Sequence, residues 1–225
     1  MDVQLTFRVN ANIYIKDPES SELGKQIIKH AIDLIYELGF EHFTFKKLAT
    51  EMHTTEATIY RYFENKHRLL LYILNWYWSY LEFLVVFKLQ DIKDPKKKLQ
   101  AIIYLLTHEL PEKLGHSDYN KIYLNQIVIA DSSKVYLVKD VHEFNKEEVF
   151  KPFKELCDQI AEIISVYNPS YKYANSLSST LLETSHDQQY FATYLPKLTN
   201  ANSKNTSDYA AEYLEDMLFR ILESK

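Results

Sequence analysis

Two His-Glu pairs and one cysteine are the residues of this 225-residue chain whose types suggest catalysis. A helical zinc site with a glutamate base needs a second histidine four residues after the first. Neither His108-Glu109 nor His142-Glu143 is followed by that histidine. Cys157 has no histidine near it in sequence to act as a base, and no second cysteine for a structural metal site. We therefore expect no enzyme, no metal and no cofactor.

A different chemistry is suggested by residues 48–63, LATEMHTTEATIYRYF, which have the rhythm of a helix, a tight turn and a second helix. Two helices that cross closely need a small residue at their contact, and Ala49 is such a residue. The turn needs a residue that tolerates a positive φ, and His53 belongs to the types enriched there. Apolar inward faces are supplied by Leu48, Met52, Ile59 and the ring of Tyr62. The stretch therefore predicts a helix-turn-helix.

Composition favours helices and excludes two kinds of nucleotide site. The chain has three glycines and six prolines, too few turn residues for a protein of many strands. Apolar residues recur at helical spacing from end to end, so we expect an all-α fold. The loops that hold dinucleotides or nucleoside triphosphates need several glycines close together, and this chain has none so placed.

Charge restricts any contact with nucleic acid to a local patch. The formal net charge of −5 argues against a general binder of polyanions. Residues 1–68 contain nine Lys and Arg against ten Asp and Glu. Within residues 46–68, however, five basic residues outnumber three acidic ones. The small basic excess therefore lies around the helix-turn-helix.

One apolar stretch raises the question of a membrane. Residues 69–87 contain 16 apolar or aromatic residues out of 19, which is the length of a membrane span. The exceptions, Asn75, Ser79 and Glu82, fall on one stripe of a helix, and a carboxylate at the bilayer centre would cost about 2.5–3.5 kcal/mol. We expect a core helix and no membrane. The chain also begins without a secretory signal, so we expect it in the cytoplasm.

Capping signals predict the helices. Asp17 and Pro18 open the first helix and Gly39 ends it, while Thr44 opens the second. After a short third and a long fourth helix, others are expected from Asp94 to near Pro111, from Asp118 to Asp131, at Ser132 or Ser133, over residues 145–168, before Pro196, and over residues 208–222. Pro152 marks either the true first turn of the 145–168 helix or a kink in it. We expect about nine or ten helices in all.

Residues 23–74 resemble the DNA-binding domain of the tetracycline-repressor (TetR) family of bacterial transcription regulators. The resemblance rests on an ordered series, namely a helix ending in Gly39-Phe40, Thr44, Leu48-Ala49, a four-residue turn, Thr58-Ile59-Tyr60, Tyr62-Phe63, and Lys66 followed by Leu69-Leu70. A lone helix-turn-helix signal is weak, whereas this combination at this spacing is specific. The resemblance implies a dimer whose third helix enters the major groove of DNA.

The resemblance also implies a division of the chain. Residues 17–68 form a three-helix helix-turn-helix DNA-binding domain with its motif at residues 44–63. Residues 1–16 precede it and are expected to be an N-terminal tail because they show no helical period. Residues 69–225 form a helical domain that binds a small-molecule effector and dimerises.

By the same resemblance, particular side chains contact double-stranded DNA. Those expected to hold phosphates are Thr44, Thr55, Tyr60, Tyr62 and Lys66, and those expected close to base edges are Glu56, Ala57, Thr58, Tyr60 and Arg61. Each also has an ordinary structural role open to it. Thr44 and Thr55 are then helix caps, Tyr62 is part of the core, and Lys66 is a solvated charge.

Glu56 has two competing interpretations. Its carboxylate can accept a hydrogen bond from cytosine N4 in the major groove, although it repels phosphates. The same carboxylate stabilises the N-terminus of the helix in which it lies. Both the base contact and the capping role remain open.

The resemblance implies dimerisation through the last two helices. The last helix has a wider apolar stripe than packing on one neighbour requires. The residues expected at the dimer interface are Leu177, Leu181, Ala210, Tyr213, Leu214, Met217, Leu218 and Ile221.

The effector site is suggested only by a heavy load of aromatic residues, 14% of the chain. A cavity lined by aromatic and a few polar groups suits a flat or long apolar ligand. The candidate lining residues are Trp76, Tyr80, Phe83, Tyr104, His108, Tyr123 and His186. The alternative is that most of them belong to the core.

The function expected from these observations is a sequence-specific DNA-binding transcriptional regulator. It would be a repressor released from its operator by a small apolar or aromatic effector. The alternative is a helical ligand-binding or interaction protein whose DNA-reading domain has lost its affinity for DNA.

Overall fold

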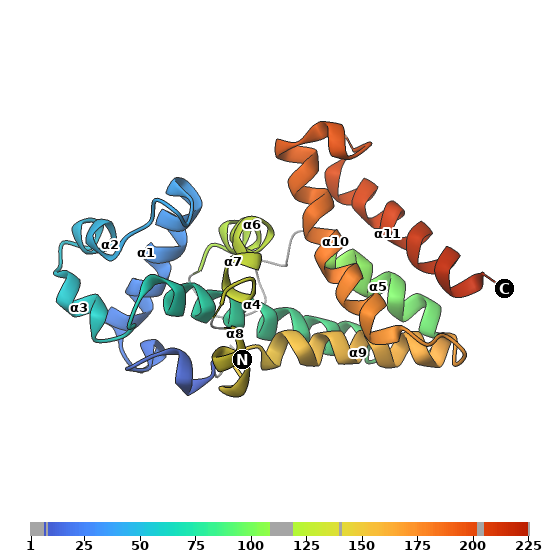
Figure 1. Cartoon of the computed structure of the whole chain (residues 1–225), viewed down its shortest axis with the longest axis horizontal. Helices are drawn as coiled ribbons and strands as arrows, with labels where there is room; N and C mark the ends of the chain where they lie inside the picture. Colours follow the sequence, from blue (N-terminus) through green and yellow to red (C-terminus); the bar gives the residue numbers. More distant parts are fainter. Residues whose placement is uncertain (1–6, 8, 109–118, 140, 202–204, 225) are drawn as a thin grey trace. The chain divides into compact units, whose positions relative to one another are not determined.

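The computed structural model describes residue 7 and residues 9–108, 119–139, 141–201 and 205–224 (Figure 1). These residues form eleven α-helices and three 3-10 helices, and no strand occurs among them. The all-α prediction is therefore confirmed. By its contacts the chain divides into two compact units, Met1–Ser79 with Leu110–Lys151, and Tyr80–Glu109 with Pro152–Lys225.

The first long helix of the first unit is α1 (Glu22–Leu38). Its N-cap is Ser21, whose hydroxyl accepts a hydrogen bond from the amide of Gly24, and not Asp17 as the sequence suggested. Asp17 caps instead a separate 3-10 helix, η2 (Pro18–Ser20), because the extended backbone at Ser21 interrupts the helical path. A Cβ on Gly24 would lie 2.2 Å from the Pro18 carbonyl oxygen, so only glycine lets η2 pack this closely on α1.

The helix-turn-helix consists of α2 (Phe45–Glu51) and α3 (Glu56–Tyr60). Thr44 caps α2 as predicted, with its hydroxyl accepting from the amide of Lys47 at 3.2 Å. The two helices pack on each other through buried side chains, which include Leu48, Ala49 and Ile59. The predicted crossing of two short helices at a small residue is therefore present.

The turn between α2 and α3 depends on His53. Its φ is 51°, in the left-handed region where only a minority of non-glycine residues lie. The amide of His53 donates to the carbonyl of Thr50 at 3.1 Å, and the amide of Thr54 donates to that of Ala49 at 2.8 Å. These bonds satisfy the free carbonyls at the end of α2. The prediction that His53 adopts a positive φ is confirmed.

The long apolar stretch forms α4 (Lys66–Leu89). Among the described residues it is the one helix long and apolar enough to cross a membrane by length and composition. In the structure, 78% of its most apolar window is buried inside the protein. Such burial is what a core helix shows, and the length test alone is weak evidence for a membrane span.

The first unit also contains α6 (Lys121–Asp131), α7 (Ser133–Tyr136) and α8 (Val141–Lys146). Asn120 caps α6, accepting from the amides of residues 122 and 123. The predicted cap, Asp118, lies outside the described residues. Helix α6 packs on α1, and the rings of Tyr36 and Tyr123 stack there at 3.8 Å between centroids.

Helix α8 is the element that the sequence did not predict. The expected helix over residues 145–168 is divided, because Glu148 has a φ of 55° and the backbone leaves the helical path there. The second part is α9 (Lys151–Tyr167), and Pro152 lies in its first turn rather than at a kink. The extra helix raises the number of α-helices from the expected nine or ten to eleven among the described residues.

The segment predicted as an N-terminal tail packs on the first unit where it is described. Residues 11–13 form the 3-10 helix η1 (Ala11–Ile13), and Val9 and Ile13 are buried. The amide of Ile15 donates to the carbonyl of Tyr62 at 2.8 Å. Residues 9–15 are therefore fastened by packing and by hydrogen bonds.

The second unit contains the C-terminal part of α4 with α5 (Pro95–Thr107), α9, α10 (Ala174–Tyr194), η3 (Pro196–Leu198) and α11 (Thr206–Glu223). Asp94 caps α5 as predicted, but the helix ends at Thr107, before Pro111, which lies outside the described residues. Helix α11 packs along both α10 and α5 (Figure 1).

The compact units do not follow the expected boundary between residues 68 and 69. Residues 110–151 belong with the N-terminal helices, because α6 packs on α1, and the unit boundary falls inside α4. The boundary between residues 68 and 69 is expected to separate DNA binding from effector binding and dimerisation, and this separation of functions stays a prediction.

The strained turn gives a test of the helix-turn-helix geometry. We predict that His53→Val lowers the free energy of unfolding by about 1–2 kcal/mol, because a β-branched residue fits the left-handed region poorly. His53→Asn is the matched control and should change it by less than about 0.5 kcal/mol. Urea unfolding measures both. An equal loss in the two variants would show that contacts of the imidazole matter, and not the backbone conformation.

Candidate nucleic-acid interface

Helix α3, which we call the reading helix, presents one solvent-facing surface. Glu56, Ala57, Tyr60 and Arg61 are all exposed, and their spacing places them on the same side of a helix. Ile59 points the opposite way and is fully buried. The Tyr60 side chain is 48% exposed, and its ring stands edge-on to Phe45 at 5.0 Å between centroids. This surface therefore offers a carboxylate, a methyl group, a phenol and a guanidinium to a partner.

Three threonines surround the start of the reading helix. Thr55 occupies the N-cap position, but its side chain makes no capping hydrogen bond. Its hydroxyl instead lies 3.1 Å from that of Thr58, which also accepts from Thr54 at 3.2 Å. Thr55 and Thr44 are exposed, whereas Thr58 is half-buried. The hydroxyl of Thr44 acts as an acceptor within the chain, so its hydrogen remains available to a phosphate oxygen.

Glu56 is the first residue of the reading helix and is exposed. Its carboxylate makes no hydrogen bond or ion pair with any described residue. Glu56 could therefore stabilise the N-terminus of the reading helix only through the attraction between its negative charge and the positive end of the helix dipole, without a hydrogen bond. The carboxylate is free to accept from a partner.

Tyr62 does not face solvent, contrary to the expectation that it holds a phosphate. Its side chain is buried, and its hydroxyl forms a 2.8 Å hydrogen bond with the hydroxyl of Ser21. This bond lowers the pKa of the Tyr62 phenol, and the ammonium of Lys16, 5.0 Å from the ring centroid, acts in the same direction. Tyr62 therefore joins the end of the helix-turn-helix to the start of α1, as its alternative core role required.

Lys66 also has a structural task in place of the expected phosphate contact. Its ammonium donates to the backbone carbonyls of Phe40, Glu41 and Phe43, at 2.9, 3.2 and 3.2 Å. It also lies 4.6 Å from the centroid of the Phe40 ring. An ammonium has three hydrogens, so these bonds leave none for a phosphate. Lys66 holds the connection between α1 and α2 against the first turn of α4.

The expected dimer interface is largely interior to the second unit. Five of its eight residues are buried within the chain, because α10 and α11 pack on each other and on α5, namely Leu177, Leu181, Ala210, Leu214 and Leu218. Tyr213 is 38% exposed, and Met217 and Ile221 are half-buried. Most of the apolar stripe of α11 is thus part of the core. The part that stays exposed or half-buried, Tyr213, Met217 and Ile221, is narrower than the sequence suggested.

The expected effector residues are divided between the two compact units. Trp76 and Tyr123 belong to the first unit and the other five to the second. Within the second unit, Tyr104 is 55% exposed and stacks on His108, whose Nε2 lies 3.2 Å from the carboxylate of Asp208. His186, in contrast, is buried in α10. The remaining two, Tyr80 and Phe83, lie on α4, one buried and the other half-buried.

Helix α10 carries buried polar groups that a simple core would not need. Gln189 donates to the carbonyls of Leu106 and Ser185, at 3.2 and 2.9 Å. Neither ring nitrogen of His186 has a hydrogen-bond partner among the described residues. Burial lowers the pKa of His186 to about 4. A buried neutral imidazole with an unused donor and an unused acceptor is suited to a polar group of a ligand or to a water molecule.

The structure also forms a hollow that the sequence did not suggest. It occupies about 720 Å³ at the surface of the first unit, between α1 and the beginning of α6. Its lining mixes both signs of charge and includes Lys29, Asp33, Glu37, Glu51 and Lys121. Lys29, Asp33 and Glu37 follow one face of α1 at a spacing of four residues, and Tyr123, one of the expected effector residues, also lines the hollow. Among the described residues, no group of three His, Cys, Asp or Glu side chains could hold a metal ion.

The carbonyl contacts of Lys66 predict a stability effect. Lys66→Met should lower the free energy of unfolding by about 1.5–3 kcal/mol, because three carbonyls lose a charged donor. Lys47→Met is the matched control, since the Lys47 ammonium is exposed and donates to a single carbonyl, that of His42. The control should lose less than about 0.5 kcal/mol in urea unfolding. Equal losses would contradict a bracing role for Lys66.

The buried imidazole predicts a pH dependence. His186 binds a proton near pH 6.5 in the unfolded chain but only near pH 4 in the folded one, so its contribution to stability is lost as pH falls through this window. His186→Leu should therefore lose roughly 3 kcal/mol less than the wild type between pH 6.5 and 4. The exposed His142→Gln should follow the wild type. Parallel stability curves for wild type and His186→Leu would contradict the prediction.

Comparison with known proteins agrees with this geometry. Residues 27–73 match the family model of the bacterial regulatory proteins of the tetR family. This match lies within the stretch of residues 23–74 and confirms the resemblance identified there. A search of curated proteins finds no match to the chain.

Solved structures of transcriptional regulators share the fold. A putative transcriptional regulator from Saccharomonospora viridis, in complex with choline, is 16% identical with a TM-score of 0.58, covering 91% of this chain and 98% of its own. AibR, in complex with isovaleryl coenzyme A and operator DNA, is 17% identical with a TM-score of 0.57, covering 88% and 97%. The fatty acid degradation regulator FadR from Bacillus halodurans is 17% identical with a TM-score of 0.57, covering 89% and 98%. The chain thus combines a match to the tetR family model over residues 27–73 with the fold seen in solved transcriptional regulators.

Proposed function

We propose that this protein is a sequence-specific transcriptional regulator that binds operator DNA as a homodimer. The observation that carries the proposal is the exposed face of the reading helix within a domain that matches the tetR family. Among the similar structures, AibR is bound to operator DNA and isovaleryl coenzyme A, and the Saccharomonospora viridis regulator is bound to choline. The two bound ligands favour regulation by a small molecule, and we propose from the aromatic content of the chain that a small apolar or aromatic effector releases this protein from DNA and that it acts as a repressor.

The exposed side chains suggest how DNA is held. We propose that the hydroxyls of Thr44 and Thr55 contact phosphates on either side of the major groove. Glu56, Ala57, Tyr60 and Arg61 then lie towards base edges, where a carboxylate accepts from cytosine N4 and a guanidinium donates to guanine. Tyr62 and Lys66 are left out of this set, because their polar groups are used inside the domain. Thr58, also expected close to base edges, is left out because it is half-buried and its hydroxyl contacts those of Thr54 and Thr55.

Dimerisation supplies the affinity that one reading helix lacks. A two-fold dimer places two reading helices about 34–36 Å apart, one turn of DNA. We propose that the exposed edge of α11, with Tyr213, Met217 and Ile221, contributes to the contact between two copies. A monomer at micromolar concentration would argue against this assembly.

Charge favours one competing function. The described part of the reading face includes Glu56 without a partner, and residues 1–68 carry no net basic excess. A helical ligand-binding or interaction protein that has lost its DNA affinity would have these features. No binding of any duplex at low salt, where phosphate contacts are strongest, would favour this alternative.

Selection of bound duplexes from random DNA tests the proposal and the role of Glu56. The wild type should enrich a two-fold sequence and bind it less tightly as salt increases. We predict that Glu56→Gln changes the preferred base at one position of each half-site by about tenfold or more in affinity. Glu51→Gln, an exposed charge at the end of α2, is the control and should keep the wild-type sequence. If Glu56→Gln changes the affinity for all sequences by the same factor, Glu56 does not contact a base and acts only on the helix dipole.

A further inference from the structure

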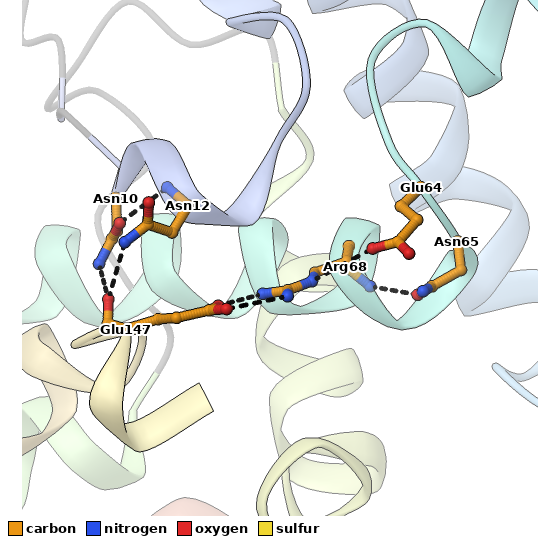
Figure 2. Close-up of polar contacts among 6 residues, drawn as sticks. All are labelled: Asn10, Asn12, Glu64, Asn65, Arg68 and Glu147. Carbon is orange, nitrogen blue, oxygen red and sulfur yellow. Dashed lines mark hydrogen bonds and ion pairs between the residues drawn. The ribbon is translucent and has the colours of Figure 1, made fainter. Parts of the chain in front are cut away.

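Three segments far apart in the sequence meet at Glu147 in the first unit (Figure 2). The carboxylate of Glu147 accepts from the guanidinium of Arg68 at 2.7 and 3.5 Å. The backbone carbonyl of the same residue accepts from the side-chain amides of Asn10 and Asn12, at 2.7 and 3.3 Å. We call these four residues the Glu147 junction.

The carbonyl of Glu147 is available because α8 ends here. Glu148 adopts a φ of 55°, and the amide of Val149 donates back to the carbonyl of Phe144 at 3.2 Å, which closes the helix end. Carbonyls at the end of a helix need partners from outside the helix. The amides of Asn10 and Asn12 supply them. The N-terminal segment, by which we mean residues 10–15, therefore caps α8. Val149, which follows this helix end, is buried.

Arg68 reaches the junction from the first turn of α4. Its side chain is 15% exposed and lies over the ring of Phe144, 4.8 Å from the centroid. Its backbone amide is held by the side chain of Asn65 at 3.0 Å. Glu64, at 3.9 Å and largely exposed, is a much weaker partner than Glu147. The guanidinium is therefore directed to Glu147 by packing and by charge.

The other end of the N-terminal segment is fastened beside the reading helix. The amide of Ile15 donates to the carbonyl of Tyr62, the second residue after α3. Tyr14 meets Tyr72 edge-on at 6.1 Å between centroids, and Ile13 between these contacts is buried. Residues 10–15 thus run from the Glu147 junction to the end of the reading helix, with fixed contacts at both ends.

We propose that Arg68, Glu147, Asn10 and Asn12 are positioning residues for operator binding. Together they hold the reading helix, through residues 10–15 and the first turn of α4, in one orientation relative to α8. The inference rests on the proposed function, because the quantity that the junction sets is the placement of α3 in the groove. None of the four residues is needed to touch DNA.

The first arm of the test measures binding to the duplex that the wild type selects. Arg68→Gln and Glu147→Gln should each weaken binding about tenfold, and the double variant should be no worse than either alone, because both remove the same interaction. The preferred sequence and the salt slope should stay those of the wild type, since no phosphate contact is lost. Glu143→Gln, which breaks the exposed ion pair between Glu143 and Lys146 on α8 but leaves the junction intact, should bind like the wild type.

The second arm needs no DNA. Amide hydrogen exchange at Ile15 reports the fixed end of the segment, and it should be faster in Asn10→Ala/Asn12→Ala and in Arg68→Gln than in the wild type. Thermal unfolding verifies that each variant is folded. If the wild type selects no duplex, the proposed function fails, while exchange at Ile15 still decides whether the junction braces the segment.

Two results would overturn the proposal. One is wild-type affinity together with wild-type exchange in Arg68→Gln and in Asn10→Ala/Asn12→Ala. The other is a salt slope reduced by about one in Arg68→Gln while Glu147→Gln binds normally, because Arg68 would then contact a phosphate directly. The exchanged pair, Arg68→Glu with Glu147→Arg, should recover part of the lost affinity if the two side chains act through each other.

Discussion

The reading helix has only five residues, and a helix of that length has no stability of its own in water. Its helical conformation and its orientation must therefore be imposed by the residues that pack against it. Ile59 anchors it to the core, His53 closes the turn before it, and the carbonyl of Tyr62 just after it is held by the amide of Ile15. Polar groups that resemble DNA contacts are used inside the same unit, where Tyr62 bonds to Ser21 and Lys66 to the connection between α1 and α2.

Lys66 and Tyr62 illustrate how the internal needs of the domain decide which polar side chains remain available to a partner. Both carry groups that commonly hold phosphates, and both are turned inward, one to three carbonyls and the other to Ser21. What remains outward is a small set on α3 together with the hydroxyls of Thr44 and Thr55. Under the proposed function, a protein of net negative charge with this small outward set among its described residues needs precise placement and a second copy to bind DNA well. The role proposed for the Glu147 junction answers this need.

Local signals in the sequence predicted local structure well. Thr44 and Asp94 cap their helices, Gly39 ends α1, and His53 has the positive φ that the turn demands. Errors arose where two local signals competed, as at Asp17, which caps a 3-10 helix while Ser21 caps α1. Glu148 left no sequence signal, since a glutamate is seldom chosen for the left-handed region, and α8 was missed for that reason.

The sequence by itself determined the helical class, the helix-turn-helix and the match of residues 27–73 to the tetR family model, because capping, periodicity and turn chemistry act between residues close along the chain. Only the tertiary structure decided which side chains are left for a partner. The apolar stripe of α11 is mostly core, the buried ring of His186 has no hydrogen-bond partner among the described residues, and the amide of Ile15 holds the carbonyl of Tyr62 just after the reading helix. These outcomes depend on contacts between residues up to 137 positions apart, as from Asn10 to Glu147, and no local pattern encodes them.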